Sequence, residues 1–182
     1  MRPQPHPTRR EALAGAAALA GAAALPAAAR AEDPQKERER RAVRAAVAAE
    51  QATAVAFEAI ANSTLLDERA SGTMHVLLDH ATAHVTALED AFKSLYGDEP
   101  PLAPKRTDIR GLIHPNSARG ALALAERLES AAIVRHLDAI RLTRNSTLLK
   151  LIAGSMGTDA QHLVMLRQLL HQDPAPDAFE RG

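Results

Sequence analysis

The sequence contains no cysteine and no tryptophan, and aromatic residues make up only 2% of its 182 residues. Without cysteine the chain can form neither a disulfide nor a thiolate metal site, so its stability depends on a packed core. Lys plus Arg equals Asp plus Glu, at 22 each, which leaves a formal net charge of zero. A neutral chain with few aromatic rings has neither the basic surface nor the stacking platform that nucleic-acid binding requires. A Gly-rich phosphate loop and a Ser nucleophile motif are also missing from the sequence.

Residues 1–31 have the pattern of an export signal. Arg9 and Arg10 precede a short run rich in Ala and Leu, which ends in the small-x-small motif Ala29-Arg30-Ala31. The run is too short and too rich in alanine to favour a spanning helix. The arginine pair resembles a twin-arginine (Tat) signal, although Glu11 and Ala12 follow it where that pattern usually has a polar residue and Phe. An ordinary Sec signal is the alternative. We expect an exported protein, periplasmic or extracellular, with no membrane span after cleavage.

The rest of the chain predicts helices almost throughout, because Ala, Leu, Arg and Glu dominate and strand-like alternation is missing. Proline and polar turn residues divide it into segments. The predicted helices cover residues 34–61, 67–96, 117–144 and 146–172. The predicted bundle domain covers residues 32–172, and residues 173–182 form an extended tail.

Connection lengths predict how these helices are arranged. Short turns join the first helix to the second and the third to the fourth, so each pair forms an antiparallel hairpin. Between the hairpins lie about twenty proline-rich residues, 97–116, which are long enough to run the length of the bundle. We therefore predict an all-α four-helix bundle of two antiparallel hairpins joined by a long crossover. The alternative is a plain up-down bundle with a loose loop.

Polar residues interrupt the apolar stripe of every predicted helix. Asp and His share the stripe of the last helix in "GTDAQHLVMLRQLL", and acid or imidazole residues interrupt the other three stripes. Counted from the nearest hairpin turn, these residues lie 14 to 19 positions away, so they share one level at the middle of the bundle. Unpaired charges in a core cost several kcal/mol, so such residues need partners. Carboxylates and imidazoles together coordinate iron, manganese or zinc. The predicted metal ligands are Glu50, His84, Glu129, Asp159 and His162.

This pattern resembles the ferritin-like superfamily, and most of all the exported bacterial ferritin-like domain-containing proteins. The segments "EQATAVAFEAIA", "DHATAHVTALE" and "QHLVMLRQLL" and the tail "DPAPDAFE" carry the likeness, which covers nearly the whole mature chain. Ferritin-like centres take one Glu from each of two helices and Glu-x-x-His from each of the other two. The resemblance implies a metal cofactor, with iron first and manganese or zinc as alternatives. It also implies di-metal oxidase or iron-handling activity.

The chain departs from the ferritin-like pattern at two positions. Asp159 replaces a Glu, which shortens its reach by one methylene group, and Ala81 stands where the second helix should supply a carboxylate. The loss at Ala81 puts a second metal ion, and with it oxygen chemistry, in question. His80 could compensate, because it lies four residues before His84, although an edge position facing solvent is the preferred interpretation.

A second interpretation treats the polar residues as purely structural. Glu129 would then pair with a core histidine, and His136 would be a core or rim residue rather than a ligand. The chain would be a degenerate, metal-free helical bundle that acts as a binding or structural module. Metal ions are the partners we expect, and dimerisation of the bundle stays open.

Overall fold

The computed structural model describes residues 33–113 and 115–175. Four α-helices form the bundle: α1 (Pro34–Ala61), α2 (Glu68–Tyr96), α3 (Ala118–Leu142) and α4 (Ser146–Leu169). The crossover contains one short 3-10 helix, η2 (Arg106–Asp108), which the sequence did not predict. The predicted all-α four-helix bundle is confirmed. The predicted export signal and residues 176–182 of the predicted tail lie outside the described residues.

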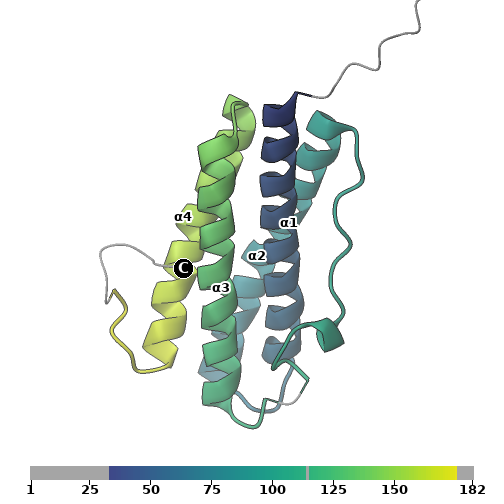
Figure 1. Cartoon of the computed structure of the whole chain (residues 1–182). Coiled ribbons are helices and arrows are strands. Elements are labelled where there is room, and N and C mark those ends of the chain that lie inside the picture. Colours follow the sequence, from purple (N-terminus) through teal and green to yellow (C-terminus); the bar gives the residue numbers. More distant parts are fainter. Residues whose placement is uncertain (1–32, 114, 176–182) are drawn as a thin grey trace, which may run out of the picture. The chain divides into compact units, whose positions relative to one another are not determined.

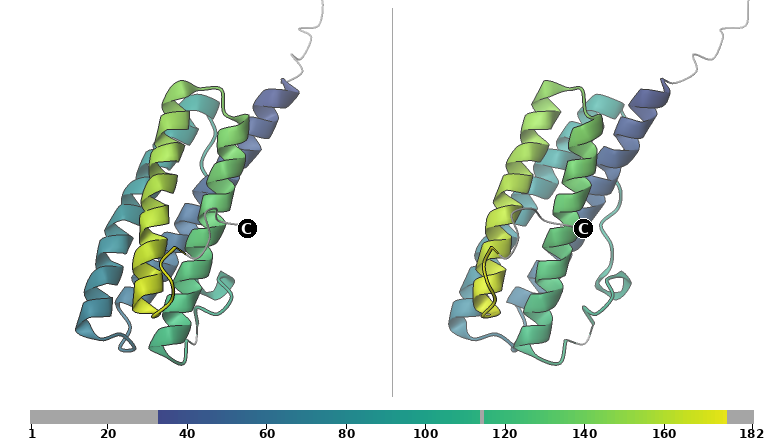
Figure 2. Two further views of the ribbon diagram at one scale, coloured as in Figure 1. Left: turned by 90° about the vertical axis from the view of Figure 1, so that its left-hand side faces the viewer. Right: turned by 60° about the vertical axis from the view of Figure 1, so that its left-hand side comes forward.

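The helices are arranged as two hairpins that lie side by side (Figure 1). α1 packs against both α2 and α3, and α4 packs against α3 and, more sparsely, against α2. The crossover runs from the end of α2 along the outside of the bundle to the opposite end, where α3 begins, and η2 contacts α1 on the way (Figures 1 and 2). This long return makes α2 and α3 run in the same direction.

A polar side chain caps the start of each helix. Asp67 accepts a hydrogen bond from the Ala70 amide at 2.8 Å, and Asn145 accepts one from the Leu148 amide at 2.9 Å. Asp33 and Ser117 cap α1 and α3 in the same way. Such caps satisfy backbone donors that have no partner within the helix.

Two helix ends differ from the prediction. α3 ends at Leu142 instead of Arg144, because Thr143 has already turned to an extended conformation. α4 ends at Leu169 instead of Gln172, because the chain reverses at His171, which has a φ of 56°. The Gln172 amide then bonds back to the Arg167 carbonyl at 2.9 Å, a helix-ending turn that the sequence did not reveal.

The core is divided into two apolar clusters. One lies toward the hairpin turn that joins α1 and α2 and is centred on Phe57, Met74 and Leu77. The other lies toward the opposite end of the bundle and includes Val47 and Phe92. Between them lie buried polar side chains, among them Glu50, Glu129 and Asp159. The fold therefore holds a polar layer at the middle of an otherwise apolar interior.

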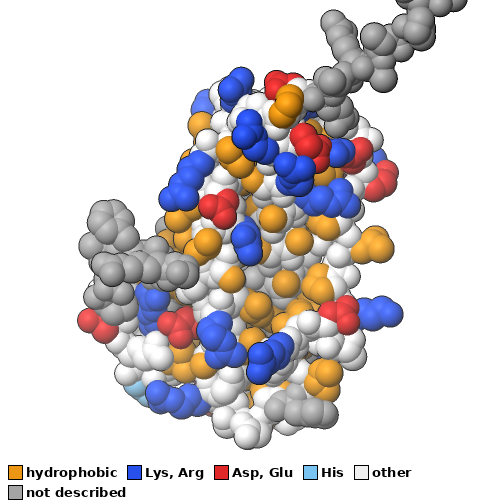
Figure 3. All heavy atoms as spheres, in the orientation of Figure 1, with side chains coloured by type: hydrophobic (Ala, Val, Ile, Leu, Met, Phe, Trp, Pro, Cys, Tyr) orange, Lys and Arg blue, Asp and Glu red, His pale blue; other side chains and the backbone are white. Residues whose placement is uncertain are grey.

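The surface carries charges of both signs. Acidic and basic side chains are intermixed over the face seen in Figure 3, with apolar side chains between them. Within residues 33–113 and 115–175, no helix combines the length and the apolar character needed to cross a membrane.

Candidate metal centre

All five predicted ligands meet in the polar layer. α1 contributes Glu50, α2 His84 and α3 Glu129, while α4 contributes both Asp159 and His162. Four of the five are at most 1% exposed, and only the His84 side chain keeps 14% exposure. The depth count made from the sequence therefore corresponds to a real layer in which every helix takes part.

The first half of the layer holds two carboxylates and two imidazoles. His84 Nδ1 lies 3.4 Å from Glu50 Oε1 and 3.3 Å from Asp159 Oδ1. His136, which is fully buried on α3, lies with Nε2 3.3 Å from Glu50 Oε1 and with Nδ1 3.1 Å from Asp159 Oδ2. Each of the four helices thus contributes one donor residue to this half.

These close atoms are not satisfied by hydrogen bonds. Both Glu50 oxygens, His84 Nδ1, both His136 nitrogens and Asp159 Oδ2 are buried without a hydrogen-bond partner among the described residues. Buried polar atoms normally have partners, and a group of orphans in one place needs an explanation. These oxygen and nitrogen atoms make ion-pair contacts at 3.1–3.4 Å, but the contacts do not have the geometry of hydrogen bonds. A cation between them would satisfy them together, so the residues present fit a metal ion.

The second half of the layer is hydrogen-bonded. Glu129 Oε1 lies 2.6 Å from His162 Nδ1, and His162 Nε2 lies 3.0 Å from His80 Nδ1. The Phe57 ring meets the His162 ring edge-on at a centroid distance of 6.5 Å. Within the described part of the chain, Glu129 Oε2 is the one buried atom of this half without a hydrogen-bond partner. The two halves of the centre therefore differ in how well their polar atoms are satisfied.

Two overlapping groups of residues have the spacing of a metal site. In each group the candidate ligand atoms all lie within 4.8 Å of one another, and Asp159 belongs to both. The groups are Glu50–His84–Asp159 and Glu129–Asp159–His162. Ala81, which is 1% exposed, faces the interior without a donor, so α2 supplies imidazole but no carboxylate.

Burial dominates the pKa values of two of the three carboxyl groups in the centre. It raises the pKa of Glu129 well above its usual value, and the negative charges of Asp159 and Glu50 add to the shift. Burial also raises the pKa of Glu50, against the opposing effect of His84. Asp159 differs: burial would raise its pKa, but His136 and His84 outweigh burial and lower it. Asp159 is thus the carboxylate most readily ionised in this layer.

The imidazoles shift in opposite directions. Burial lowers the pKa of His84, but the neighbouring carboxylates of Asp159 and Glu50 outweigh it and raise the value to about 9. Burial lowers the pKa of His162 to about 4, with Asp159 opposing. Without a metal, a protonated His84 would offset part of the carboxylate charge while His162 stays neutral.

Sequence reasoning left two histidines out of the predicted site. His136 lies seven residues, or two turns, after Glu129, so its position on the inward face of α3 was a usable signal that we set aside as core. His80 is exposed, as expected for an edge residue, and it still reaches the buried His162. The position of His136 is compatible with the expected core role and with a ligand role. The position of His80 is compatible with the expected edge role and with a ligand role.

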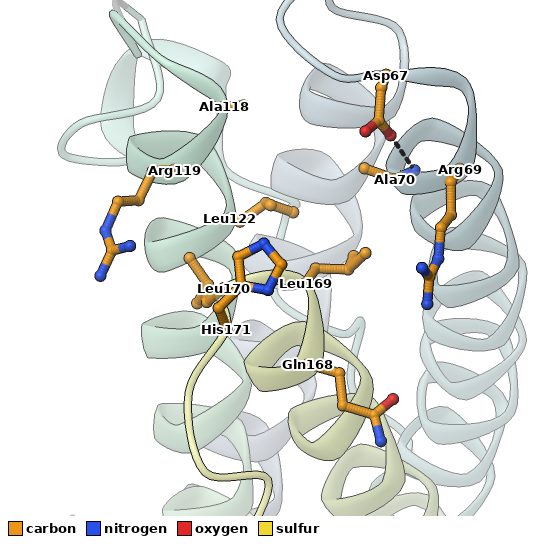
Figure 4. A pocket seen from close by; sticks show the side chains of 10 residues that line it. All are labelled: Asp67, Arg69, Ala70, Ala118, Arg119, Leu122, Gln168, Leu169, Leu170 and His171. Carbon is orange, nitrogen blue, oxygen red and sulfur yellow. Dashed lines mark hydrogen bonds between the residues drawn. The ribbon is translucent and has the colours of Figure 1, made fainter.

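A separate pocket of about 300 Å³ lies at the end of the bundle where α4 stops (Figure 4). None of the five predicted ligands lines it. Its walls come from the starts of α2 and α3 and the end of α4, and they include Arg69, Arg119 and His171. This pocket therefore does not give access to the polar layer.

Comparison with known proteins agrees with this architecture. A sequence model of the ferritin-like domain family matches residues 38–172. A crystal structure of a conserved hypothetical protein from Mycobacterium tuberculosis superposes with a TM-score of 0.67 at 17% identity, covering 80% of this chain and 99% of that one. At this identity the likeness concerns the fold alone. No curated protein matches the chain.

Proposed function

Because the chain belongs to the ferritin-like domain family, we propose that it binds a divalent transition-metal ion in the polar layer of its bundle. The observation that carries this proposal is the set of buried oxygen and nitrogen atoms without hydrogen-bond partners in the first half of the centre. In a purely structural network these buried atoms would be expected to form aligned hydrogen bonds with one another. They make only ion-pair contacts, at 3.1–3.4 Å. A metal ion gives them one common partner.

The donor set favours a transition metal over magnesium or calcium. The layer combines three carboxylates with three buried or half-buried imidazoles, and imidazole suits iron and zinc, whereas magnesium and calcium prefer all-oxygen sites. We take iron as the first candidate, with manganese and zinc as the alternatives. When bound, such an ion supplies Lewis-acid chemistry, and iron adds one-electron chemistry.

The residues of this centre would have different roles in holding a metal ion. Asp159 lies between the two candidate groups and is the most easily ionised carboxylate, so it would hold a first ion. Glu129 has a raised pKa and a hydrogen bond to His162, so it would have to lose a proton before it could bind. Ala81 leaves the second group one carboxylate short of the family pattern. We therefore favour one tightly held ion and metal handling over a complete di-metal oxidase.

The test is to measure metal content and thermal stability together. Purified protein is loaded with ferrous, manganous or zinc ion, and metal per chain and the melting temperature are measured before and after loading. Binding to the native state alone raises stability by RT ln(1 + [L]/Kd), which is about 2.7 kcal/mol at a hundredfold excess over Kd. Glu50→Gln should lose both effects. Asp90→Asn, which changes an exposed acid on α2, should keep them.

A metal-free structural module is the second candidate function, and one observation favours it. His84 has a pKa of about 9, so at neutral pH it would carry a positive charge that offsets the carboxylates without any metal. This interpretation predicts a melting temperature that does not respond to metal and a protein that retains none after purification.

We also propose that the protein is exported, on the strength of the arginine pair, the alanine-rich run and the motif that ends at Ala31. Export through the Tat pathway would deliver a folded protein with its metal already bound. Fusing residues 1–31 to a reporter that is active only after export tests this, with Arg9 and Arg10 changed to Lys as the variant that separates Tat from Sec.

A further inference from the structure

His80 connects the solvent to the buried centre. It is exposed on α2, one turn before His84, and its Nδ1 lies 3.0 Å from Nε2 of the buried His162. The two rings are nearly parallel, at 13°, with centroids 5.2 Å apart. Facing nitrogens at 3.0 Å with centroids this far apart mean that the rings meet edge to edge in one plane. The contact is therefore an N–H···N hydrogen bond, in which one imidazole donates to the other.

Three histidines form a gradient of exposure into the layer. His80 is exposed, the His84 side chain is 14% exposed, and the His162 side chain is 2% exposed. The His84 and His162 rings lie 6.3 Å apart between centroids, so the steps between successive imidazoles are short. No described residue hydrogen-bonds Nε2 of His80. A hydrated cation at the surface would therefore meet an available imidazole first.

The seam between α2 and α4 is suited to such a passage. Among the neighbouring helix pairs, α2 and α4 share the sparsest packing. The α2 residue beside His80 that faces inward is the small Ala81. The α2 side of the seam therefore has little side-chain bulk next to His80.

We propose that His80 is the access ligand of the centre, an imidazole that binds a divalent cation from solvent and passes it to the buried donors. The proposal rests on the metal binding proposed above. At the surface the ion exchanges one hydration water for His80 Nε2, and that water returns to solvent. The hydrogen bond between His80 and His162 breaks as the ring turns. His84 releases its proton to solvent and then takes the ion toward Glu50 and Asp159. His80 acts during transfer and is not a ligand of the loaded centre.

Loading kinetics test this assignment. Metal-free full-length protein is mixed with cobaltous ion, and the cobalt absorption band follows loading, with release measured by adding a chelator. We expect His80→Ala to slow both loading and release about tenfold, equivalent to about 1.4 kcal/mol on each barrier. The dissociation constant should stay unchanged, because an access ligand changes both rates alike. His75→Ala, an exposed histidine on the same helix, should match wild type.

His80→Gln separates access from positioning. A Gln side chain can still hydrogen-bond His162 Nε2, as donor or as acceptor, but it is a poor ligand for cobalt. If His80 only orients His162, Gln restores wild-type behaviour and Ala weakens binding by about 10–100-fold, as for other outer-shell partners. That result overturns the proposal, as does wild-type loading by His80→Ala. If wild type binds no cobalt, iron, manganese or zinc, the proposed function itself fails. Slow loading by both the Ala and the Gln variant supports the access role of His80.

Discussion

His136 Nδ1 lies 3.1 Å from Asp159 Oδ2, and neither atom has a hydrogen-bond partner among the described residues. The two side chains come from α3 and α4, and a fully buried imidazole is thereby held against a carboxylate that has kept its charge. Buried groups this close would normally form an aligned bond. The two atoms make an ion-pair contact without the geometry of a hydrogen bond, and under the proposed function a metal ion would be their common partner.

The first prediction concerns His136 itself. His136→Gln should weaken metal binding by at least about 10–100-fold, the loss found when even an outer-shell partner of a metal ligand is removed. The measurement is a metal titration followed by calorimetry. His75→Gln is the matched control, because it changes a histidine outside the layer. Equal affinity for wild type and His136→Gln would return His136 to a purely structural role.

The second prediction separates the two halves of the centre. Asp159 belongs to both candidate groups, so Asp159→Asn should abolish binding altogether. Glu129→Gln should keep one ion per chain, because Glu129 belongs only to the half that is already hydrogen-bonded. Elemental analysis after loading and desalting gives the stoichiometry. If Glu129→Gln lost all metal, the first half would not be a sufficient site.

The third prediction concerns the pH dependence of the metal-free protein. The folded pKa of His84 is about 9 against 6.5 unfolded, so its contribution to stability is present below pH 6.5 and is lost as the pH rises through 9. The folded pKa of His162 is about 4, so its contribution is present above pH 6.5 and is lost as the pH falls through 4. Denaturant unfolding across this pH range measures both losses of stability.

Single variants show which histidine causes each loss of stability. His84→Gln should flatten the loss of stability between pH 6.5 and 9, and His162→Gln should flatten the loss between pH 6.5 and 4. His75→Ala should leave both slopes as they are in wild type. Unchanged slopes in the two layer variants would show that other groups control the profile.

The fourth prediction restores a carboxylate at Ala81. This side chain is 1% exposed and lies one turn before His84, so Ala81→Glu points an acid into the layer. Repulsion from the carboxylates already there should destabilise the metal-free protein by about 1–3 kcal/mol near neutral pH. Metal should reverse that loss, and the stoichiometry should rise toward two ions per chain. Equal destabilisation with and without metal would support a metal-free bundle.

Much of the fold could be predicted because its signals are local and periodic. The caps at Asp67, Ser117 and Asn145 mark helix starts, and the proline-rich stretch marks the crossover. The reversal at His171 was missed because a non-glycine residue rarely takes a positive φ. The level of the layer followed from counting residues along helices, which rise by a constant amount per residue.

The centre was harder to predict than the fold because its chemistry depends on contacts between helices. His136 and Glu129 share the inward face of α3, but the sequence could not reveal that His136 reaches both Glu50 and Asp159. His80 looked like an edge residue because its contact with His162 joins positions 82 residues apart. Side-chain direction across a helix interface is a tertiary property, so periodicity within one helix does not determine it.

The measurement that tests the central claim most directly is anomalous diffraction from crystals of the protein soaked in manganous or ferrous ion, recorded on both sides of the metal absorption edge. We predict one strong peak between Glu50, His84, His136 and Asp159, with ligand distances of about 2.0–2.3 Å. A layer without an anomalous peak, in which these side chains close up into aligned hydrogen bonds with one another, would contradict it.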